Sequence, residues 1–256
     1  MACHKADDDR FDHKYKISKT WLEDTKAAPT VYQYEKGKLA VVRYPDGSSL
    51  HVLYGKKFQV KRINYEDIDG NIYQWADITF KENKIEEVKL YDSRYGLIAN
   101  QKFTIKNGKI AKVYSYNYQM PAKAEIKNIL FDAQSLELLV TQSKTKANPL
   151  TIEHDVTYTG DNITTVVTYD QLLNDTVTTH YVYDENKNPY YGITYLFMGL
   201  QGYSRNNPVT KSISYATEAL NYTYSYVYDK HRYPTVISEK TGKGEEGINT
   251  YVEYTE

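Results

Sequence analysis

The sequence lacks several features that would narrow its class at once. One cysteine, Cys3, stands among 256 residues, so an intrachain disulfide is excluded. No apolar run approaches the roughly 18 residues that a membrane-spanning helix requires. Phosphate loops, dinucleotide-binding glycine patterns and Gly-x-Ser-x-Gly are also missing, so three common enzyme classes have no signature here.

Charge of one sign is lacking as well. The 32 basic and 33 acidic residues leave a formal net charge of −1. A protein that binds nucleic acid electrostatically needs an excess of clustered lysine and arginine, and we therefore expect no nucleic-acid partner. A mean hydropathy of −0.67 with 41% hydrophobic residues indicates a thin core and much polar surface.

Tyrosine is the residue present in excess. The chain has 28 tyrosines against 6 phenylalanines and 2 tryptophans. Tyrosine combines an apolar ring with a polar tip, which suits sheet surfaces that are only half buried. This composition favours a β-rich protein.

The tyrosines recur in a pattern. Residues 180–192 read HYVYDENKNPYYG, and a near-copy at 222–236 reads YTYSYVYDKHRYPTV. Within the second copy Tyr222, Tyr224, Tyr226 and Tyr228 alternate with other residues, so a strand would project all four rings to one face.

Turn sequences separate the alternating segments. Asp69-Gly70 and Asn107-Gly108 are pairs that supply the positive φ angles of two-residue hairpins. Strands joined by such short links must be antiparallel neighbours. We predict an all-β fold: a long, strongly twisted antiparallel meander of hairpin repeats, forming an open sheet or a partly closed barrel. Its first and last strands would be edges, which lysines such as Lys240 would protect.

Four segments depart from the pattern. Residues 1–14 read as a flexible tether, and a weak helical or irregular patch is predicted around Trp21 within 15–26. Residues 121–139 favour strands over a helical turn. Residues 194–200, the most apolar run, are expected to form one short helix or plug over the sheet. Residues 15–256 are predicted to be a single repeat-built domain, with an alternative sub-boundary near 145–150.

The position of Cys3 predicts a lipid anchor. If an upstream signal peptide has been removed, Cys3 would be the acylated first residue of a mature bacterial lipoprotein, with the small Ala2 before the cleavage point. The polar residues that follow suit a solvated tether. We expect contact with the membrane only through this anchor.

Several segments together resemble a family of uncharacterised Bacteroidetes lipoproteins of unknown function, built from degenerate repeats like the YD repeats of Rhs-type surface proteins. The resemblance is carried by Cys3 with its acidic follow-on and by YDENKNPYYG at 183–192, SRNNPV at 204–209 and YVYDKHRYPT at 226–235. It is strongest after about residue 150. Asn188-Pro189 and Arg232-Tyr233 stand where YD repeats usually have glycine. The resemblance implies an exported, β-rich outer-membrane lipoprotein, periplasmic or surface-exposed, and supplies no chemistry.

Catalysis and metal binding find little support in the sequence. The six histidines show no metal-ligand spacing, so neither a metal nor a cofactor is expected. Adjacent acidic residues such as Glu86-Glu87 point to opposite faces of a strand and form no catalytic pair. We predict a protein that is not an enzyme. The rivals are a glycan-directed hydrolase with carboxylates from separate strands and a purely structural envelope protein.

A binding role is the favoured hypothesis, with a glycan or a peptide as the partner. Aromatic rings on a rigid sheet are good platforms for either ligand. The candidates are Trp75 with Tyr73, and Tyr190, Tyr191 and Tyr203 beside the apolar segment. For each of these rings the competing interpretation is packing in the core or at its margin. The sequence does not determine the oligomeric state.

Overall fold

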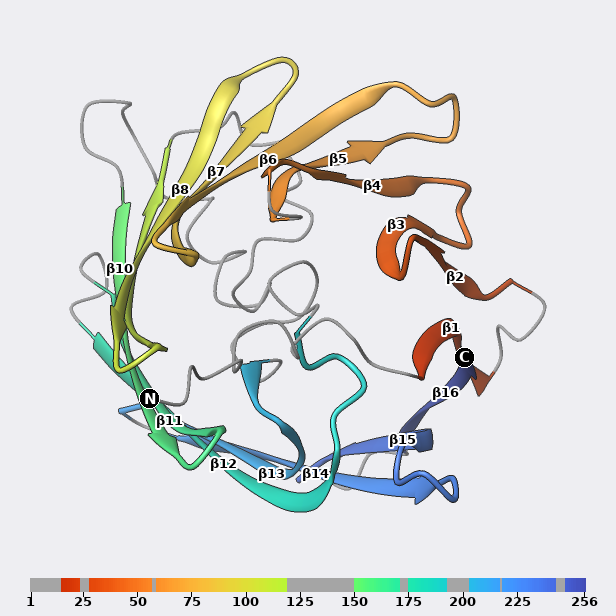
Figure 1. Ribbon diagram of the computed structural model, residues 1–256. Helices are drawn as coiled ribbons and strands as arrows, with labels where there is room; N and C mark the ends of the chain where they lie inside the picture. The colour runs from red at the N-terminus through yellow and green to blue at the C-terminus, as the bar shows by residue number, and fades with distance from the viewer. Residues whose placement is uncertain are drawn as a thin grey trace, which may run out of the picture.

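The protein is a closed antiparallel β-barrel (Figure 1). The computed structural model describes residues 15–23, 28–56, 59–118, 150–170, 175–192, 203–216, 218–242 and 247–256. Within them each strand pairs with its neighbours in chain order, and the last strand pairs with the first. The strands are β1 (Lys16–Leu22), β2 (Thr30–Glu35), β3 (Lys38–Arg43), β4 (Ser49–Tyr54), β5 (Val60–Glu66), β6 (Ile72–Lys81), β7 (Lys84–Asp92), β8 (Gly96–Lys106), β9 (Lys109–Asn117), β10 (Leu150–Thr159), β11 (Asn162–Asp170), β12 (Asp175–Lys187), β13 (Asn206–Ser214), β14 (Ala219–Tyr228), β15 (Pro234–Thr241) and β16 (Ile248–Thr255).

Hairpin turns create this topology. The two linking residues Asn107 and Gly108 have φ angles of 52° and 79°, and Glu82 and Asn83 have 50° and 63°. Positive φ at both positions gives the turn a twist that matches the twist of the flanking strands. The predicted all-β antiparallel meander is thereby confirmed.

Closure of the barrel corrects two expectations about its ends. The helical patch expected around Trp21 is wrong: Trp21 lies in β1, directly opposite Tyr251 of β16. Their rings stack at 5.6 Å with an interplanar angle of 8°. The edge strands expected at the two ends are therefore paired with each other. Local sequence favoured a helix weakly, and long-range pairing decided the outcome.

The inner face of β3–β11 is aliphatic. Along β6, Gln74, Ala76 and Ile78 are buried while Trp75 and Asp77 are half-buried, so the even-numbered positions face inward. Cross-strand partners continue this core around the wall, because Ile63 pairs with Ala76 and Leu90 with Ala99. The fully buried members include Leu50, Ile63, Ile98, Val113 and Ile163.

Some predicted segments lie outside the described residues. These are the tether at 1–14 with Cys3, the whole of 121–139, and the apolar segment at 194–200. Among the described residues no helix is long and apolar enough to cross a membrane.

Candidate functional site

The inner face changes character beyond β11, where tyrosines replace aliphatic residues. On β14 the tyrosines are half-buried, whereas the residues between them, such as Thr223 and Ser225, are exposed. The four rings therefore share one face of the strand, as their alternation predicted, and in the structure that face lines the barrel interior. We call the inward tyrosines of β12 and β14 the tyrosine wall, and they are Tyr181, Tyr183, Tyr222, Tyr224, Tyr226 and Tyr228.

Stacking and pairing hold these rings in place. Tyr226 and Tyr228 stack with centroids 5.6 Å apart, and Tyr181 lies 6.2 Å from Tyr183 in a tilted arrangement. The two rings of each pair lie two residues apart on one strand, and aromatic pairs at such distances contribute roughly 0.5–1.5 kcal/mol beyond the burial of their area. The wall is incompletely buried, unlike the aliphatic core, so its rings retain surface for a ligand.

Charged side chains share the same inner face. Lys211 of β13 faces Tyr222 across the strand pair, with its Nζ 5.1 Å from the ring centroid. Glu239 of β15 is the cross-strand partner of Tyr224. Asp184 of β12 accepts a hydrogen bond from the Tyr228 hydroxyl. The wall therefore contains a cation and two carboxylates besides its aromatic faces.

Asp184 is fixed by four hydrogen bonds. Its Oδ1 accepts the backbone N–H groups of Asn186 at 2.9 Å and Asn207 at 3.1 Å. Its Oδ2 accepts the Asn186 side-chain amide at 3.3 Å and the Tyr228 hydroxyl. With both oxygens engaged, this carboxylate ties β12 to β13 and β14.

The surroundings of the tyrosine wall favour the neutral, protonated form of its hydroxyl groups. Burial raises the pKa of Tyr226 above its ordinary value, and the neighbouring Tyr228, Asp184, Tyr224 and Glu239 raise it further. Burial likewise raises the pKa of Tyr224, and Glu239 adds to the shift. Neutral hydroxyls donate and accept hydrogen bonds at physiological pH, which suits recognition of hydroxyl groups.

Four tyrosine hydroxyls join neighbouring strands near one end of the barrel. Each lies near the end of an even-numbered strand and donates to a backbone carbonyl of the preceding strand. The pairs are Tyr54 to Leu39 at 2.8 Å, Tyr183 to Ile163 at 2.6 Å, Tyr254 to Pro234 at 2.6 Å, and Tyr226 to Pro208. Phenylalanine cannot make this bond, which explains part of the tyrosine excess.

Two of the predicted ligand-binding tyrosines are positioned by Asn188. Its side-chain Oδ1 accepts the Tyr190 N–H at 3.0 Å, and its backbone carbonyl accepts the Tyr191 N–H at 3.2 Å. Burial raises the pKa of Tyr190 well above its ordinary value, and nearby Tyr32 and Tyr34 raise it further. Tyr190 therefore lies on the inner side, near the rings of β2.

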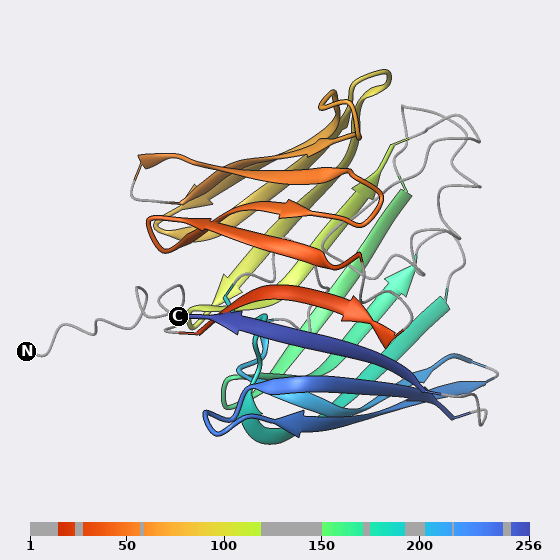
Figure 2. The same ribbon diagram turned by 90° about the vertical axis from the view of Figure 1, so that its right-hand side faces the viewer.

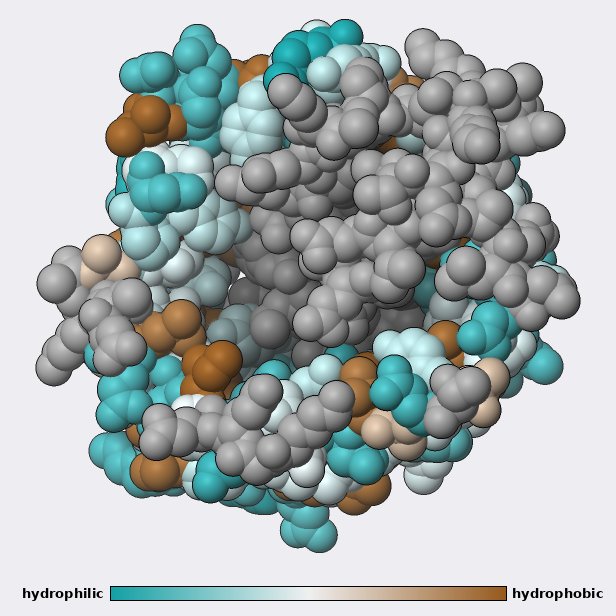
Figure 3. All heavy atoms as spheres, turned by 180° about the vertical axis from the view of Figure 1, so that it is seen from behind, coloured by the Kyte–Doolittle hydropathy of each residue, from teal (hydrophilic) through white to brown (hydrophobic). Residues whose placement is uncertain are grey.

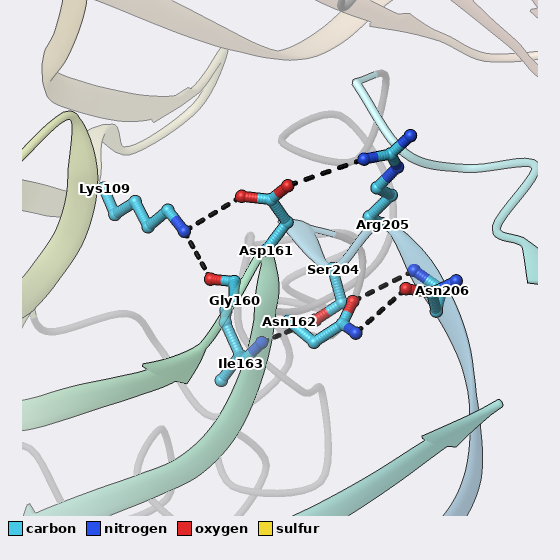
Figure 4. Close-up of polar contacts among 8 residues, drawn as sticks. All are labelled: Lys109, Gly160, Asp161, Asn162, Ile163, Ser204, Arg205 and Asn206. Carbon is cyan, nitrogen blue, oxygen red and sulfur yellow. Dashed lines mark hydrogen bonds and ion pairs between the residues drawn. The ribbon is translucent and has the colours of Figure 1, made fainter. Parts of the chain in front are cut away.

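Tyr203 packs against the aliphatic core, beside a group of polar contacts that we call the polar clamp and that Figure 4 shows in part. Ser204, next to Tyr203, accepts the Ile163 N–H at 2.9 Å, as Figure 4 shows. It also donates to the Tyr183 hydroxyl at 2.9 Å. Figure 4 also shows Asn162 and Asn206 joined by two hydrogen bonds of 3.0 Å.

Charged residues complete the clamp at the β10–β11 turn. Lys109 donates to Asp161 at 3.0 Å and to the Gly160 carbonyl, and Arg205 lies 3.7 Å from Asp161. The clamp joins the β10–β11 turn to the start of β13.

Trp75 and Tyr73 lie apart from that region. Trp75 points outward and stacks on Tyr91 at 5.2 Å, and the Arg62 guanidinium lies 5.8 Å from its ring centroid. Arg62 also forms a bidentate ion pair with Asp77, at 2.6 and 2.9 Å. Tyr73, by contrast, packs against the aliphatic core. The predicted site residues therefore do not form one site. Trp75 lies on the outer face, Tyr73 and Tyr203 pack against the aliphatic core, and Tyr190 and Tyr191 are held by Asn188.

Sequence reasoning did not find Lys211, Glu239 and Asp184 as members of one wall. The alternation on β14 was visible, but its cross-strand partners depend on register, which no local motif encodes. Among the described residues no group of three or more His, Cys, Asp or Glu side chains could hold a metal ion.

Comparisons with known proteins show the fold. No family model matches the sequence, and no curated protein matches it. A porin-like protein from Bacteroides vulgatus is similar in structure, with a TM-score of 0.58 and 11% identity over 94% of this chain and 99% of that chain. A porin-like protein from Bacteroides uniformis gives a TM-score of 0.55 and 10% identity over 93% of this chain and 96% of that chain. At such low identity the likeness establishes a shared barrel architecture, which this chain adopts along nearly its whole length.

Proposed function

We propose that this chain is a non-catalytic protein of the bacterial envelope whose barrel stands in water and binds a glycan on the tyrosine wall. A lipid on Cys3 would hold it at the outer membrane. The two porin-like proteins from Bacteroides support an envelope location by analogy. One observation carries the proposal of a water-facing barrel, namely the charge on its outer wall.

The outer wall carries charged rows at mid-barrel height. One row of directly opposed residues runs across five strands, through Arg62, Asp77, Lys89, Asn100 and Tyr116. A second row places Glu87 opposite Lys102. Ion pairs join Arg62 with Asp77 at 2.6 Å and Lys89 with Glu87 at 3.0 Å. On the neighbouring strands Lys112 pairs with Glu153 and Asp155 at 3.1 Å each.

A strand barrel that spans a bilayer needs an outward apolar band about 25 Å tall. Placing lysine or arginine at the bilayer midplane costs roughly 2–4 kcal/mol per residue. Along β5–β10 the alternation is the reverse, with aliphatic residues inside and charged residues outside. This supports a barrel that is held at a membrane without its strands entering the lipid.

Two measurements test the location. The full chain with Cys3→Ser should remain in solution without detergent, and its outer lysines, such as Lys89, should react with an aqueous amine reagent. A requirement for detergent would reject the water-facing barrel. Mass spectrometry of the native protein tests the anchor, since an unmodified Cys3 thiol would disprove it.

The tyrosine wall supports a glycan as the ligand. Sugar rings stack on aromatic faces and exchange hydrogen bonds with neutral hydroxyls and carboxylates. Tyr224 with Glu239, and Tyr222 with Lys211, supply both kinds of contact on neighbouring strands. A peptide strand is the second ligand class, since the same rings accommodate it.

A glycan array followed by calorimetry tests the binding site. Tyr224→Ala on the wall should weaken binding about tenfold or more, while Tyr116→Ala on the outer face should leave it unchanged. Trp75→Ala and Tyr191→Ala test the other predicted residues. A loss confined to Trp75→Ala would move the site to the outer wall. Silence across broad glycan and peptide arrays would reject the binding proposal.

A glycan-directed hydrolase is the rival function, and one observation favours it. Asp184 and Glu239 come from separate strands, and both raise the pKa of Tyr226, so the two carboxylates share one neighbourhood. Against it, the four hydrogen bonds of Asp184 describe a structural anchor. Release of reducing sugar that is abolished by Glu239→Gln, with binding retained, would establish the hydrolase.

A further inference from the structure

The meander separates the links between strands into two rims. Because neighbouring strands run in opposite directions, links that follow even-numbered strands lie at one end and links that follow odd-numbered strands lie at the other. Each rim is taken here as the described link residues with two strand residues on either side. The start of β1 and the end of β16 belong to the first rim (Figure 2).

The first rim, which we call the basic rim, holds thirteen lysines and arginines against five acidic residues. The basic residues are Lys16, Lys36, Lys38, Lys56, Lys61, Lys81, Lys84, Lys106, Lys109, Lys187, Arg205, Lys230 and Arg232. The acidic residues are Glu35, Glu82, Asp161, Asp229 and Glu256.

The opposite rim, the acidic rim, has the reverse balance, with nine acidic residues against three basic ones. The acidic residues are Glu23, Asp46, Glu66, Asp67, Asp69, Asp92, Asp170, Asp175 and Glu218, and the basic ones are Arg43, Arg94 and Lys240. Viewed from behind (Figure 3), hydrophilic residues cluster on the periphery of the barrel. A net charge of −1 for the whole chain conceals this separation.

Stability alone does not explain the basic rim. Lys81 lies directly opposite Lys84, and Lys106 lies directly opposite Lys109, across two hairpin turns. Like charges in directly opposed positions destabilise a sheet. Lys81, Lys84 and Lys106 are exposed, and within the described part of the chain none of the three forms an ion pair. Such an arrangement points to a negatively charged partner.

The distance between the rims allows a charged surface to interact electrostatically with one rim while the other is screened by salt. Most strands have 8 to 13 residues, and at a rise of about 3.3 Å per residue the two ends of such a strand lie roughly 20 Å or more apart. That exceeds the screening length of about 8 Å at physiological salt. A negatively charged surface therefore attracts the basic rim without repelling the acidic one.

We propose that the basic rim is the docking surface for a membrane that displays anionic phospholipid headgroups, with the barrel standing upright on it. Chain direction supports this occupant, because β1 begins on the basic rim at Lys16, thirteen residues after Cys3. A lipid on Cys3 would therefore hold this rim towards the bilayer, where each exposed lysine or arginine near an anionic surface contributes about 1 kcal/mol to binding. The lipid on Cys3 is the only part of this proposal that rests on the proposed function. The charge of the basic rim should bind anionic lipid without that anchor.

Vesicle co-sedimentation with the full-length Cys3→Ser chain tests the rim without any lipid anchor. Vesicles containing phosphatidylglycerol should bind the protein at low salt and release it as salt rises, whereas phosphatidylcholine vesicles should not bind it. Lys81→Glu with Lys84→Glu should weaken binding roughly thirty-fold or more. Arg43→Glu with Lys240→Glu changes the net charge by the same amount on the acidic rim, and should leave binding nearly unchanged.

Three outcomes overturn the proposal. These are no binding to anionic vesicles, equal weakening by both double variants, and equally tight binding of duplex DNA that the rim variant also weakens. The last would make the rim a general polyanion site. An unmodified Cys3 in the native protein, with vesicle binding intact, would remove the anchor and leave the docking surface standing.

Discussion

Arg232 occupies a backbone position that favours glycine. Its φ angle is 69°, close to the 81° of Gly70 in the β5–β6 turn. The two turns match closely: Arg232 N–H donates to the Asp229 carbonyl at 3.1 Å, and Gly70 N–H donates to the Asp67 carbonyl at 3.0 Å. Arg232, which stands where YD repeats usually have glycine, therefore has a strained backbone. Its side chain offsets the strain, because its Nε donates a hydrogen bond to the Asn186 side-chain oxygen at 2.9 Å.

Two truncations of Arg232 separate the strain from the side-chain bonds. Both Arg232→Ala and Arg232→Gly lose the bond to Asn186, but only glycine relieves the left-handed backbone, which costs other residues roughly 1–2 kcal/mol. We expect Arg232→Gly to be more stable than Arg232→Ala by about 1 kcal/mol in urea unfolding. Lys230, in the same turn without a positive φ, is the control, and there alanine should be the more stable. If the glycine and alanine variants had the same order of stability at both positions, backbone strain at Arg232 would be ruled out.

His154 makes stability depend on pH. It is 5% exposed on the inner face, and burial lowers its pKa from 6.5 to about 4. Between these values the unfolded chain binds the proton more tightly than the folded chain. The contribution of neutral His154 to the free energy of unfolding is therefore complete above pH 6.5. It is lost as pH falls towards 4, which lowers the free energy of unfolding by about 3 kcal/mol.

Urea unfolding across this range measures the effect. His154→Gln should flatten the change in unfolding free energy between pH 6.5 and 4. His180→Gln, on the exposed outer face of β12, should leave the slope as it is in the parent protein. An unchanged slope in His154→Gln would assign the pH dependence to other groups.

At the scale of elements, the tyrosine hydroxyls predict which tyrosines tolerate phenylalanine. Tyr54 donates to the Leu39 carbonyl at 2.8 Å, and burial raises its pKa to about 12. Tyr54→Phe leaves that carbonyl without its donor and should cost about 1 kcal/mol. Tyr91→Phe keeps the stack on Trp75 and should cost little, because the described structure gives its hydroxyl no hydrogen bond. Thermal unfolding compares the two, and equal costs would refute a role for the hydroxyl.

Sequence patterns fixed at short range were predictable. Asn107-Gly108 marks a hairpin and the alternating tyrosines of β14 mark a strand face, because turn angles and side-chain period are local properties. Trp21 was assigned wrongly because its strand forms only by pairing with Tyr251, 230 positions later in the chain. Lys211 and Glu239 were missed for the same reason, since only register places them on the tyrosine wall. The two rims likewise need the strand directions before the charges can be assigned to them.

For the whole molecule, closure joins the first strand to the last. Lys19 and Glu253 lie directly opposite each other at this seam, with Nζ and Oε2 3.3 Å apart. Directly opposed residues of antiparallel strands lie close enough for a disulfide. Lys19→Cys with Glu253→Cys, in a Cys3→Ser background, should therefore form an intramolecular disulfide under mild oxidation.

That disulfide would close a loop of more than 200 residues and should raise the unfolding free energy by up to about 5 kcal/mol. Faster migration on a non-reducing gel and a higher Tm, both reversed by a reductant, are the measurements. Lys19→Cys with Thr79→Cys is the control, because Thr79 lies on β6, across from Glu87 of β7 and away from the seam. If neither variant forms a monomeric disulfide, β1 and β16 are not neighbours. The barrel would then be open at this seam.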